Sequence, residues 1–476
     1  MLGIFTLIFG TGILLGILDG LEHKSYLLAF AAAIVVVAVY FILRKILAGK
    51  QFLCDRTNPV KLGFILSAGC FLLNLVYVLI VRIEPTVDFY TFWMTAVRLA
   101  NGEGLLHEIY VAAFPHILGY SAFLSIFLRI FGEHYLVAAV LNVVLTALSC
   151  YFIYMMCLRC FGVRAACFAA LFWIVCPSKM MYNPMVLSEP FYTCLFLASI
   201  YIIMCVHRSS GYGWKSLLFC AAAAALAGCC LAAANAARPV AAVIIIAFFI
   251  WLLLLRGCEL KNGWLWKKWA VFAVVLLAVY SLYSSAWNKY AEETLGEEIP
   301  SFPGYNFYVG FNTQYWGSYS PEDMELFQTY LWCGKYSVVE AQELMLEHAK
   351  ERISSGQIDF PYLFMKKLQT FLGCDEGGAY YSKAILSSQQ YSILAIISNI
   401  WYYVLAMLTL LSAGKLFVKK TDTVFSIVPM FIIGLTLAQM LVEIAGRYHY
   451  SIIPMLIIIA AFYAENNKPM EANHVT

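Results

Sequence analysis

Long apolar runs alternate with short polar stretches along this chain, and most runs are long enough to cross a bilayer as a helix. A spanning helix needs about 20 consecutive, mostly apolar residues. Such runs lie near residues 2–18, 25–43, 62–81, 134–158, 165–182, 190–206, 216–236, 239–255, 270–287, 389–411, 424–442 and 449–464. With a further apolar run at 116–131, the pattern predicts an all-α polytopic membrane protein of about 12–13 transmembrane helices.

Composition agrees with this prediction and excludes several functions. The chain is 62% hydrophobic and 12% charged, against roughly 25% charged residues in an ordinary soluble domain. A formal net charge of +3 is too small to indicate a nucleic-acid partner. Most cysteines lie inside apolar runs, and none has zinc-ligand spacing. We therefore predict no metal site and no cofactor, and leave a divalent cation requirement open.

Basic residues fix the expected orientation, because cytoplasmic loops collect Lys and Arg. Five basic loops occur, at Arg44 to Lys61, Arg159 to Arg164, Arg208 to Lys215, Arg256 to Lys268, and Lys415 to Lys420. Placing all five inside makes both termini cytoplasmic. This arrangement requires that residues 116–131, a short run containing Arg129, form a juxtamembrane helix. If that run does cross, another segment must be re-entrant.

The same topology divides the chain into three parts. Residues 1–287 form an N-terminal transmembrane module with a first extracytoplasmic loop at 83–133. Residues 288–388 are polar, rich in Tyr, Trp and Asn, and carry helical patterns, which predicts a mostly helical extracytoplasmic cap. Residues 389–476 are expected to supply the C-terminal transmembrane helices and a short cytoplasmic tail.

The first outer loop contains Asp88 at the start of an amphipathic helix, with Tyr90 and other aromatic residues beside it. Helix N-termini favour carboxylates, so Asp88 could serve as an N-cap. The alternative is a general base at the membrane edge that takes a proton from an acceptor hydroxyl. Tyr90 is a candidate contact for the sugar or the acceptor.

Further polar groups are expected on the same side of the membrane. Glu189, in a Ser-Glu-Pro helix start, is either a capping residue or a second catalytic carboxylate. Lys179 and Arg238 are candidate phosphate ligands, although Arg238 could instead reach lipid headgroups. The last outer corner is denser: Arg447 and His449 are candidate phosphate ligands.

The remaining candidates would contact sugar, acceptor or lipid phosphate. Glu443, one helical turn before Arg447, and Tyr448 next to it are candidate sugar or acceptor contacts, as are Asn306, Asn312 and Trp316 in the cap. Amides and aromatic faces suit hydroxyl-rich ligands, although the same composition occurs in ordinary loops. Lys367 lies near the return of the cap to the membrane and is a candidate phosphate ligand. No nucleotide-binding motif occurs in the sequence, so an activated group would come from a lipid.

The order of these motifs resembles the GT-C superfamily of integral-membrane glycosyltransferases. It is similar to bacterial members of glycosyltransferase family 39, the protein O-mannosyltransferase and aminoarabinose transferase group. The matching pieces are "DFYTFWMTAVRLANGEG", "FPHILGYSAFLSIFLRIFG", "LSEPFY", "GRYHYSIIPMLIIIAAFY", "YNFYVGFNTQYWG" and "YLFMKKLQTFLG". One departure is that Phe89 follows Asp88 where an acidic pair would be expected, which leaves the acceptor open.

The resemblance implies a GT-C-type helix bundle in a bacterial plasma membrane with its active site on the extracytoplasmic side. It implies transfer of a sugar from a polyprenyl-phosphate donor to a hydroxyl on a glycan, lipid or protein, with inversion. Asp88 would be the base and Glu189 a second functional residue. The alternatives are a flippase or transporter of lipid-linked sugars, and a polyprenyl-linked glycan polymerase or ligase. A transporter should show paired halves or broken helices near mid-membrane, and neither is evident.

Overall fold

A computed structural model describes residues 1–20, 24–46, 57–256, 263–417 and 423–464, and within these ranges the secondary structure is helical with no strand. Parts of three basic loops expected inside, including Lys50, Arg56, Lys261, Lys419 and Lys420, lie outside the described residues, as does most of the C-terminal tail.

Ten helical segments in the described ranges are long and apolar enough to cross a membrane. They are α1 (Leu2–Asp19), α2 (Lys24–Ile46), α3 (Pro59–Ile80), α7 (Tyr135–Phe161), α10 (Glu189–Arg208), α11 (Trp214–Ala237), α13 (Gly263–Leu295), α19 (Ser388–Leu416), Thr423–Leu441, which contains α20 (Ile427–Leu441), and Gly446–Ala464, which contains α21 (Ile452–Ala461). The prediction of a polytopic all-α membrane protein is confirmed. The runs expected at 165–182 and 239–255 form shorter apolar helices, α8 (Val163–Ile174) and Ala241–Leu255.

The run at 116–131 forms α6 (His116–Phe131), which is shorter than the ten candidate spans. It packs beside α4 (Asp88–Ala100) and against α11. Arg129 of α6 donates to the carbonyls of Leu99 and Ala100 at the end of α4. A cation is favourable there because the last carbonyls of a helix have no partner within the helix. Arg129 therefore joins two helices of the outer loop.

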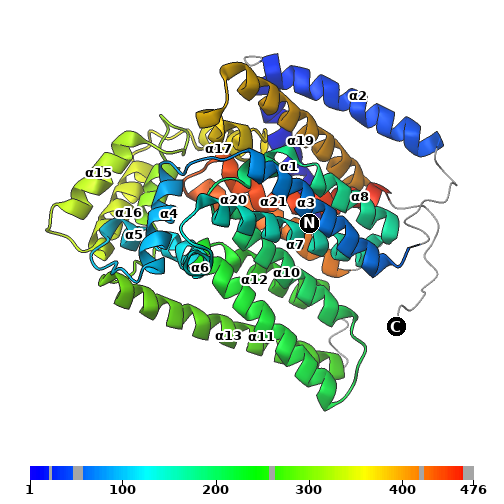
Figure 1. Cartoon of the computed structure of the whole chain (residues 1–476), viewed down its shortest axis with the longest axis horizontal. Coiled ribbons are helices and arrows are strands. Elements are labelled where there is room, and N and C mark those ends of the chain that lie inside the picture. The colour runs from blue at the N-terminus through cyan, green and yellow to red at the C-terminus, as the bar shows by residue number, and fades with distance from the viewer. Residues whose placement is uncertain (21–23, 47–56, 257–262, 418–422, 465–476) are drawn as a thin grey trace.

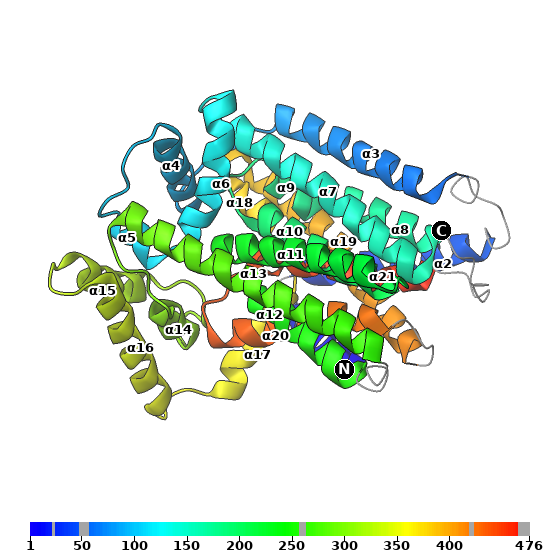
Figure 2. The same ribbon diagram turned by 90° about the horizontal axis from the view of Figure 1, so that it is seen from below.

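The cap lies at one end of the bundle. It comprises α14 (Gly304–Gly310), α15 (Pro321–Trp332), α16 (Val338–Ser354), α17 (Phe360–Leu372) and α18 (Gly377–Tyr381). Figure 1 and Figure 2 show α15 and α16 at the same end of the molecule as α4, α5 (Ile109–Ala113) and α6, and α16 packs against α5. The ends of α2, α8 and α11 that adjoin the basic loops lie at the opposite end (Figures 1 and 2). The acidic segments expected outside and the basic loops expected inside thus occupy opposite ends of the molecule (Figures 1 and 2).

Local sequence explains where the cap helices begin. Ser320 accepts a hydrogen bond from Asp323 N at the start of α15, and Ser337 forms a capping box with Glu340 at the start of α16. Asp359 caps α17 in the same way. These side chains satisfy amides that a helix start leaves unpaired. The cap is therefore an ordered helical layer over one end of the bundle.

Candidate active site

The structure brings Asp88 and Arg447 together although 358 residues separate them in the chain. The Arg447 Nη2 atom donates to Asp88 Oδ2 over 2.6 Å, and Arg447 Nε lies 3.8 Å from Glu189 Oε1. Asp88 begins α4, Glu189 begins α10, and Arg447 lies in the short 3₁₀ helix Gly446–Ser451. One guanidinium is therefore held between carboxylates from two helix N-termini, where the helix dipole favours negative charge.

The two carboxylates differ in their access to solvent. The Asp88 side chain is 48% exposed, whereas Glu189 is 5% and Arg447 11% exposed. Glu189 is therefore a fixed partner of the guanidinium, and Asp88 is free to leave it. Asp88 is the first residue of α4, and the N-cap is Val87, which makes no side-chain capping bond. The structure thus gives no support to the capping alternative.

Val87 adopts a left-handed backbone conformation, with φ of 50°. This region is unfavourable for a β-branched residue and costs on the order of 1–3 kcal/mol. The side chain of Val87 is exposed and gains little packing in return. The strained turn sets the direction in which Asp88 enters α4, so a disfavoured backbone conformation lies directly next to the ion pair.

Aromatic rings enclose the Arg447 guanidinium. Its Cζ lies 5.4 Å from the ring centre of Phe89, 5.3 Å from that of Tyr381 and 5.7 Å from that of Tyr448. Ring faces attract a cation at these distances. Tyr381 was not among the site residues expected from the sequence. The pair Gly377 and Gly378 just before it is a sequence signal that a close helix contact could occur there.

Those two glycines allow α18 to approach α9 (Pro177–Tyr182) closely. A Cβ at Gly377 would lie 2.2 Å from the Tyr182 hydroxyl, and one at Gly378 would lie 2.6 Å from the Ser178 carbonyl oxygen. Neither distance is possible for a real side chain. The glycines therefore place Tyr381 over the site.

A second guanidinium lies beside the first. Arg238, at the end of α11, has its Cζ 3.9 Å from the ring centre of Tyr448. The Tyr448 ring thus lies close to the guanidinium groups of both Arg238 and Arg447. Within the described part of the chain, no carboxylate lies within 4.0 Å of the Arg238 guanidinium. The Arg238 guanidinium is therefore available to an anionic ligand such as a phosphate.

Glu443 and Asn306 also meet. Asn306 Nδ2 lies 3.4 Å from Glu443 Oε2, and the Glu443 backbone N–H donates to the Asn306 carbonyl over 2.8 Å. The pKa of Glu443 is raised to about 7, chiefly by burial; Arg447 and Arg238 oppose this shift, and Asp88 adds to it. A carboxyl group that titrates near neutral pH can exchange protons during a reaction.

The geometry contradicts three of the expected phosphate ligands. Lys367 is buried, and its ammonium donates to the carbonyls of Gly310, Met440 and Val442 over 2.7–2.9 Å. All three protons are used, so none remains for a phosphate. Lys179 is also buried, and it donates to the carbonyls of Trp173 and Ile174 at the end of α8. Both lysines join backbone segments.

His449 is the third. Its Nδ1 lies 2.7 Å from the Phe371 carbonyl oxygen and its Nε2 lies 3.1 Å from Asp375 Oδ1. The ring also stacks on Tyr402, with centres 5.7 Å apart. Both nitrogens are occupied in a buried position, so His449 anchors the 3₁₀ helix that carries Arg447. Sequence spacing placed it near Arg447 but could not show which way the ring points.

The expected sugar contacts in the cap divide in the same way. Asn312 is buried and used internally, because it donates to Asp323 and accepts from the backbone amides of Gln314 and Tyr315. Trp316 packs edge-on against Tyr362 with ring centres 5.0 Å apart. Tyr90 is exposed on α4. Only Asn306 is joined to the Arg447 site, through Glu443.

No group of three or more His, Cys, Asp or Glu side chains that could hold a metal ion occurs in the part of the chain that the structure describes. The carboxylates around Arg447 face a guanidinium rather than one another. Guanidinium groups are thus the positive charges that the described residues themselves supply at this site.

Comparison with known proteins gives one family match. Residues 115–283 match the family model described as dolichyl-phosphate-mannose-protein mannosyltransferase. This segment includes Glu189 and Arg238, whereas Asp88 and Arg447 lie outside it. No curated protein matches the chain.

Two solved structures show a distant likeness. The archaeal oligosaccharyltransferase AglB from Archaeoglobus fulgidus, in complex with an inhibitory peptide and a dolichol-phosphate, is 13% identical with a TM-score of 0.46, over 83% of this chain and 50% of AglB. ArnT from Cupriavidus metallidurans, bound to undecaprenyl phosphate, is 11% identical with a TM-score of 0.37, over 82% of this chain and 77% of ArnT. The chain thus spans half the length of AglB. The family match confirms the resemblance expected from the motifs: over residues 115–283 the chain is similar to the dolichyl-phosphate-mannose-protein mannosyltransferases of the GT-C superfamily.

Proposed function

We propose that the protein is a glycosyltransferase that moves a sugar from a polyprenyl-phosphate donor to an acceptor hydroxyl at the outer face of the membrane. The observation that carries this proposal is the ion pair of the half-exposed Asp88 with the enclosed Arg447. A carboxylate that can accept a proton lies beside a guanidinium that can hold a phosphate, and a second guanidinium, that of Arg238, lies close to the same Tyr448 ring. The family match over residues 115–283 supports the same reaction class.

The ion pair suggests how donor binding prepares the base. In the ion pair, Asp88 Oδ2 is occupied by the Arg447 guanidinium. The donor phosphate would take the place of Asp88 on Arg447, while the buried Glu189 keeps the guanidinium in position. The Asp88 carboxylate would then be free to accept a hydrogen bond from the acceptor hydroxyl. Donor binding and base activation are coupled in this scheme.

The transfer step balances with these groups. The acceptor hydroxyl loses its proton to the Asp88 carboxylate as its oxygen bonds to the anomeric carbon of the sugar. The bond from that carbon to the phosphate oxygen breaks, and its electron pair leaves with the polyprenyl phosphate. Attack opposite to the departing phosphate inverts the anomeric configuration. Arg447 and Arg238 stabilise the negative charge that develops on the leaving phosphate.

The experiment is transfer by the purified protein in phospholipid nanodiscs. A panel of polyprenyl-phosphate hexoses, each with an isotopic label in the sugar, is incubated with glycan, glycolipid and protein fractions of a bacterial cell envelope. Mass spectrometry then identifies labelled products, and NMR gives the anomeric configuration. We expect a covalently glycosylated product of inverted configuration. Movement of intact donor between leaflets without such a product would instead indicate a transporter.

A further inference from the structure

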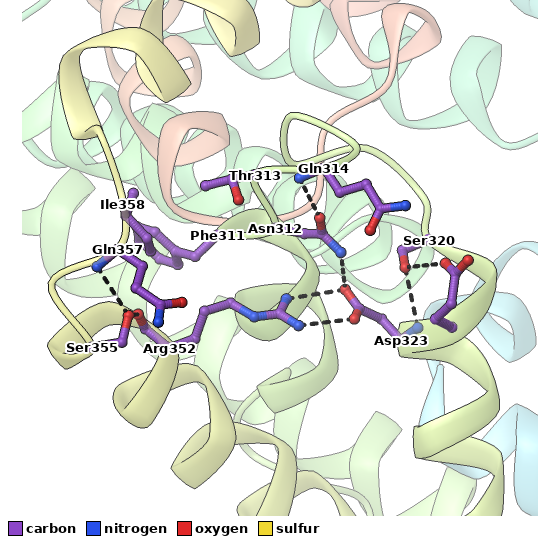
Figure 3. A pocket seen from close by; sticks show the side chains of 11 residues that line it. Phe311, Asn312, Thr313, Gln314, Ser320, Asp323, Arg352, Ser355, Gln357 and Ile358 are labelled. Carbon is purple, nitrogen blue, oxygen red and sulfur yellow. Dashed lines mark hydrogen bonds and ion pairs between the residues drawn. The ribbon is translucent and has the colours of Figure 1, made fainter.

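The cap contains a polar cavity of about 260 Å³ that the Arg447 site does not use. Its walls come from the loop after α14, the start of α15, and the end of α16 with the loop that follows (Figure 3). Pockets for drug-sized ligands have volumes of roughly 300–1,000 Å³. The cavity is therefore of a size for one small ring and its substituents.

Two of the three charged side chains in the cavity wall, Arg352 and Asp323, are paired with one another. Arg352 donates to both carboxylate oxygens of Asp323 over 2.9 and 3.1 Å and to the Tyr308 carbonyl over 2.8 Å. Asn312 donates to the same carboxylate over 2.7 Å. Among the described residues that line the cavity, Arg352 is the only cationic side chain. An anionic ligand would find no free cation there and would face Glu322.

Uncharged polar groups remain available. The side chains of Thr313, Gln314 and Gln357 line the cavity and make no hydrogen bond with other described residues. Figure 3 shows Gln314 and Gln357 on opposite sides of the cavity, with the apolar side chains of Phe311 and Ile358 near Gln357. Each amide offers donors and an acceptor. Hydroxyl groups around an apolar ring face match such a surface, whereas a phosphate or carboxylate does not.

The cavity wall is tied to the Arg447 site by the backbone. The Gly317 carbonyl accepts from Ile444 N–H over 2.8 Å, and the Asn306 carbonyl accepts from Glu443 N–H over the same distance. A Cβ at Gly310 would lie 2.6 Å from the Val442 carbonyl carbon, so the two segments are in direct contact. The loop between α14 and α15 thus borders both the cavity and the segment that leads to Arg447.

We propose that this cavity binds an uncharged carbohydrate, a sugar residue of the acceptor. The uncharged amide and hydroxyl groups of the cavity wall indicate that the ligand is a carbohydrate. Its identity as part of the acceptor rests on the proposed function and on the backbone contacts that join the cavity loop to the segment leading to Arg447. The acceptor is then a glycan or glycolipid that occupies the cap with one sugar and presents a hydroxyl of another to Asp88.

The experiment measures saccharide binding directly, by saturation-transfer-difference NMR on the full chain in phospholipid nanodiscs. Detergents with sugar headgroups are avoided because they would themselves be ligands. The probes are neutral mono- and disaccharides of glucose, galactose, mannose and N-acetylglucosamine. We expect saturation transfer to at least one of them. The double variant Gln314→Ala with Gln357→Ala should bind it at least about tenfold more weakly, as expected for two lost hydrogen-bonding side chains.

Two further variants make the result decisive. Gln389→Ala removes an exposed glutamine at the start of α19, away from the cavity, and should leave binding unchanged. Asp88→Asn should also bind the saccharide normally, which separates this proposal from the transferase chemistry. The proposal is overturned if no saccharide binds the wild-type protein or if the double variant binds as the wild type does. Absence of transfer by the wild-type protein, together with intact saccharide binding, would count against the proposed function alone.

Discussion

Replacement of Asp88 with Asn tests the proposed mechanism most directly. The substitution keeps the size and hydrogen-bonding shape of the side chain but removes its charge and its ability to accept a proton. Asn is as good as Asp at a helix N-terminus. A capping role would therefore survive the change, whereas a general base would not.

The structure sets the expected magnitudes. General-base catalysis contributes about 10²- to 10⁴-fold in rate, or about 3–5.5 kcal/mol of the barrier. The Asp88 side chain is 48% exposed, and exposed ion pairs contribute about 0–1 kcal/mol to stability. The free energy of unfolding should therefore change by less than about 1 kcal/mol. Donor affinity should hold or rise, because the donor phosphate no longer competes with a carboxylate for Arg447.

The assay is single-turnover release of polyprenyl phosphate in nanodiscs, with the labelled donor and acceptor fraction that the wild type uses. Donor affinity is measured separately, by equilibrium binding without acceptor. The matched control is Glu103→Gln, which removes another exposed carboxylate of the first outer loop, 3.7 Å from Arg98. The control should transfer at the wild-type rate.

Either of two results would contradict the proposed role of Asp88 as the general base. Transfer by Asp88→Asn within about threefold of the wild-type rate would show that Asp88 is not the base, since the expected loss is at least about 10²-fold. A fall in donor affinity that accounts for the whole loss of rate would show that Asp88 acts in binding. In that case the exchange of Asp88 for phosphate on Arg447 would be wrong.

Three further predictions concern the surroundings of the site. Arg447→Gln should abolish donor binding and destabilise the protein by about 3–5 kcal/mol, because it leaves the buried Glu189 carboxylate unpaired. Adding Glu189→Gln should restore the unfolding temperature but not donor binding. Donor binding by this double variant would contradict the role of Arg447. Lys367→Met should lower the unfolding temperature, since three buried carbonyls lose the ammonium that donates hydrogen bonds to them. The affinity of the folded protein for the polyprenyl-phosphate sugar should not change. Weaker binding of that sugar donor at full stability would reinstate Lys367 as a ligand. Burial raises the pKa of Glu443 from its ordinary value to about 7, so the stability that its proton binding contributes is present below about pH 4.5 and lost as pH rises through 7. The unfolding temperature of Glu443→Gln, relative to that of the wild type, should therefore increase between pH 5 and 8. A difference that stays constant over this range would exclude the raised pKa.

Several features of the site could be predicted from the sequence because they are local. Asp88, Glu189 and Arg447 each lie at the end of an apolar run, and runs of that length must cross the membrane as helices. Their ends then lie at one of two surfaces. Knowing the side of each end was enough to expect these three residues on the same face of the molecule.

The misassigned residues show where local reasoning stops. Lys179, Lys367 and His449 are polar residues near the same surface, so sequence position could not separate them from Arg447. What separates them is which carbonyl groups lie within reach. The ends of α8, α14 and α20 leave carbonyl oxygens without helical partners, and the two buried lysines satisfy them. Only packing decides which helix ends are buried together.

The amino-acid pattern was sufficient for the helical class and for the positions of the long apolar segments, except that some of them form shorter helices. It was also sufficient for the candidate carboxylates and cations at the helix ends expected outside. This is so because the hydrocarbon core forces backbone groups to pair within each segment, which makes a spanning helix a property of its own residues. The tertiary structure alone decided that Arg447 lies between Asp88 and Glu189, that Tyr381 encloses it, and that the cap contains a cavity lined by neutral amides. The Arg447 site depends on contacts between segments hundreds of residues apart, such as the close approach that Gly377 and Gly378 permit, and the cavity depends on how separate cap helices pack. No local pattern encodes the direction of a side chain across such a contact.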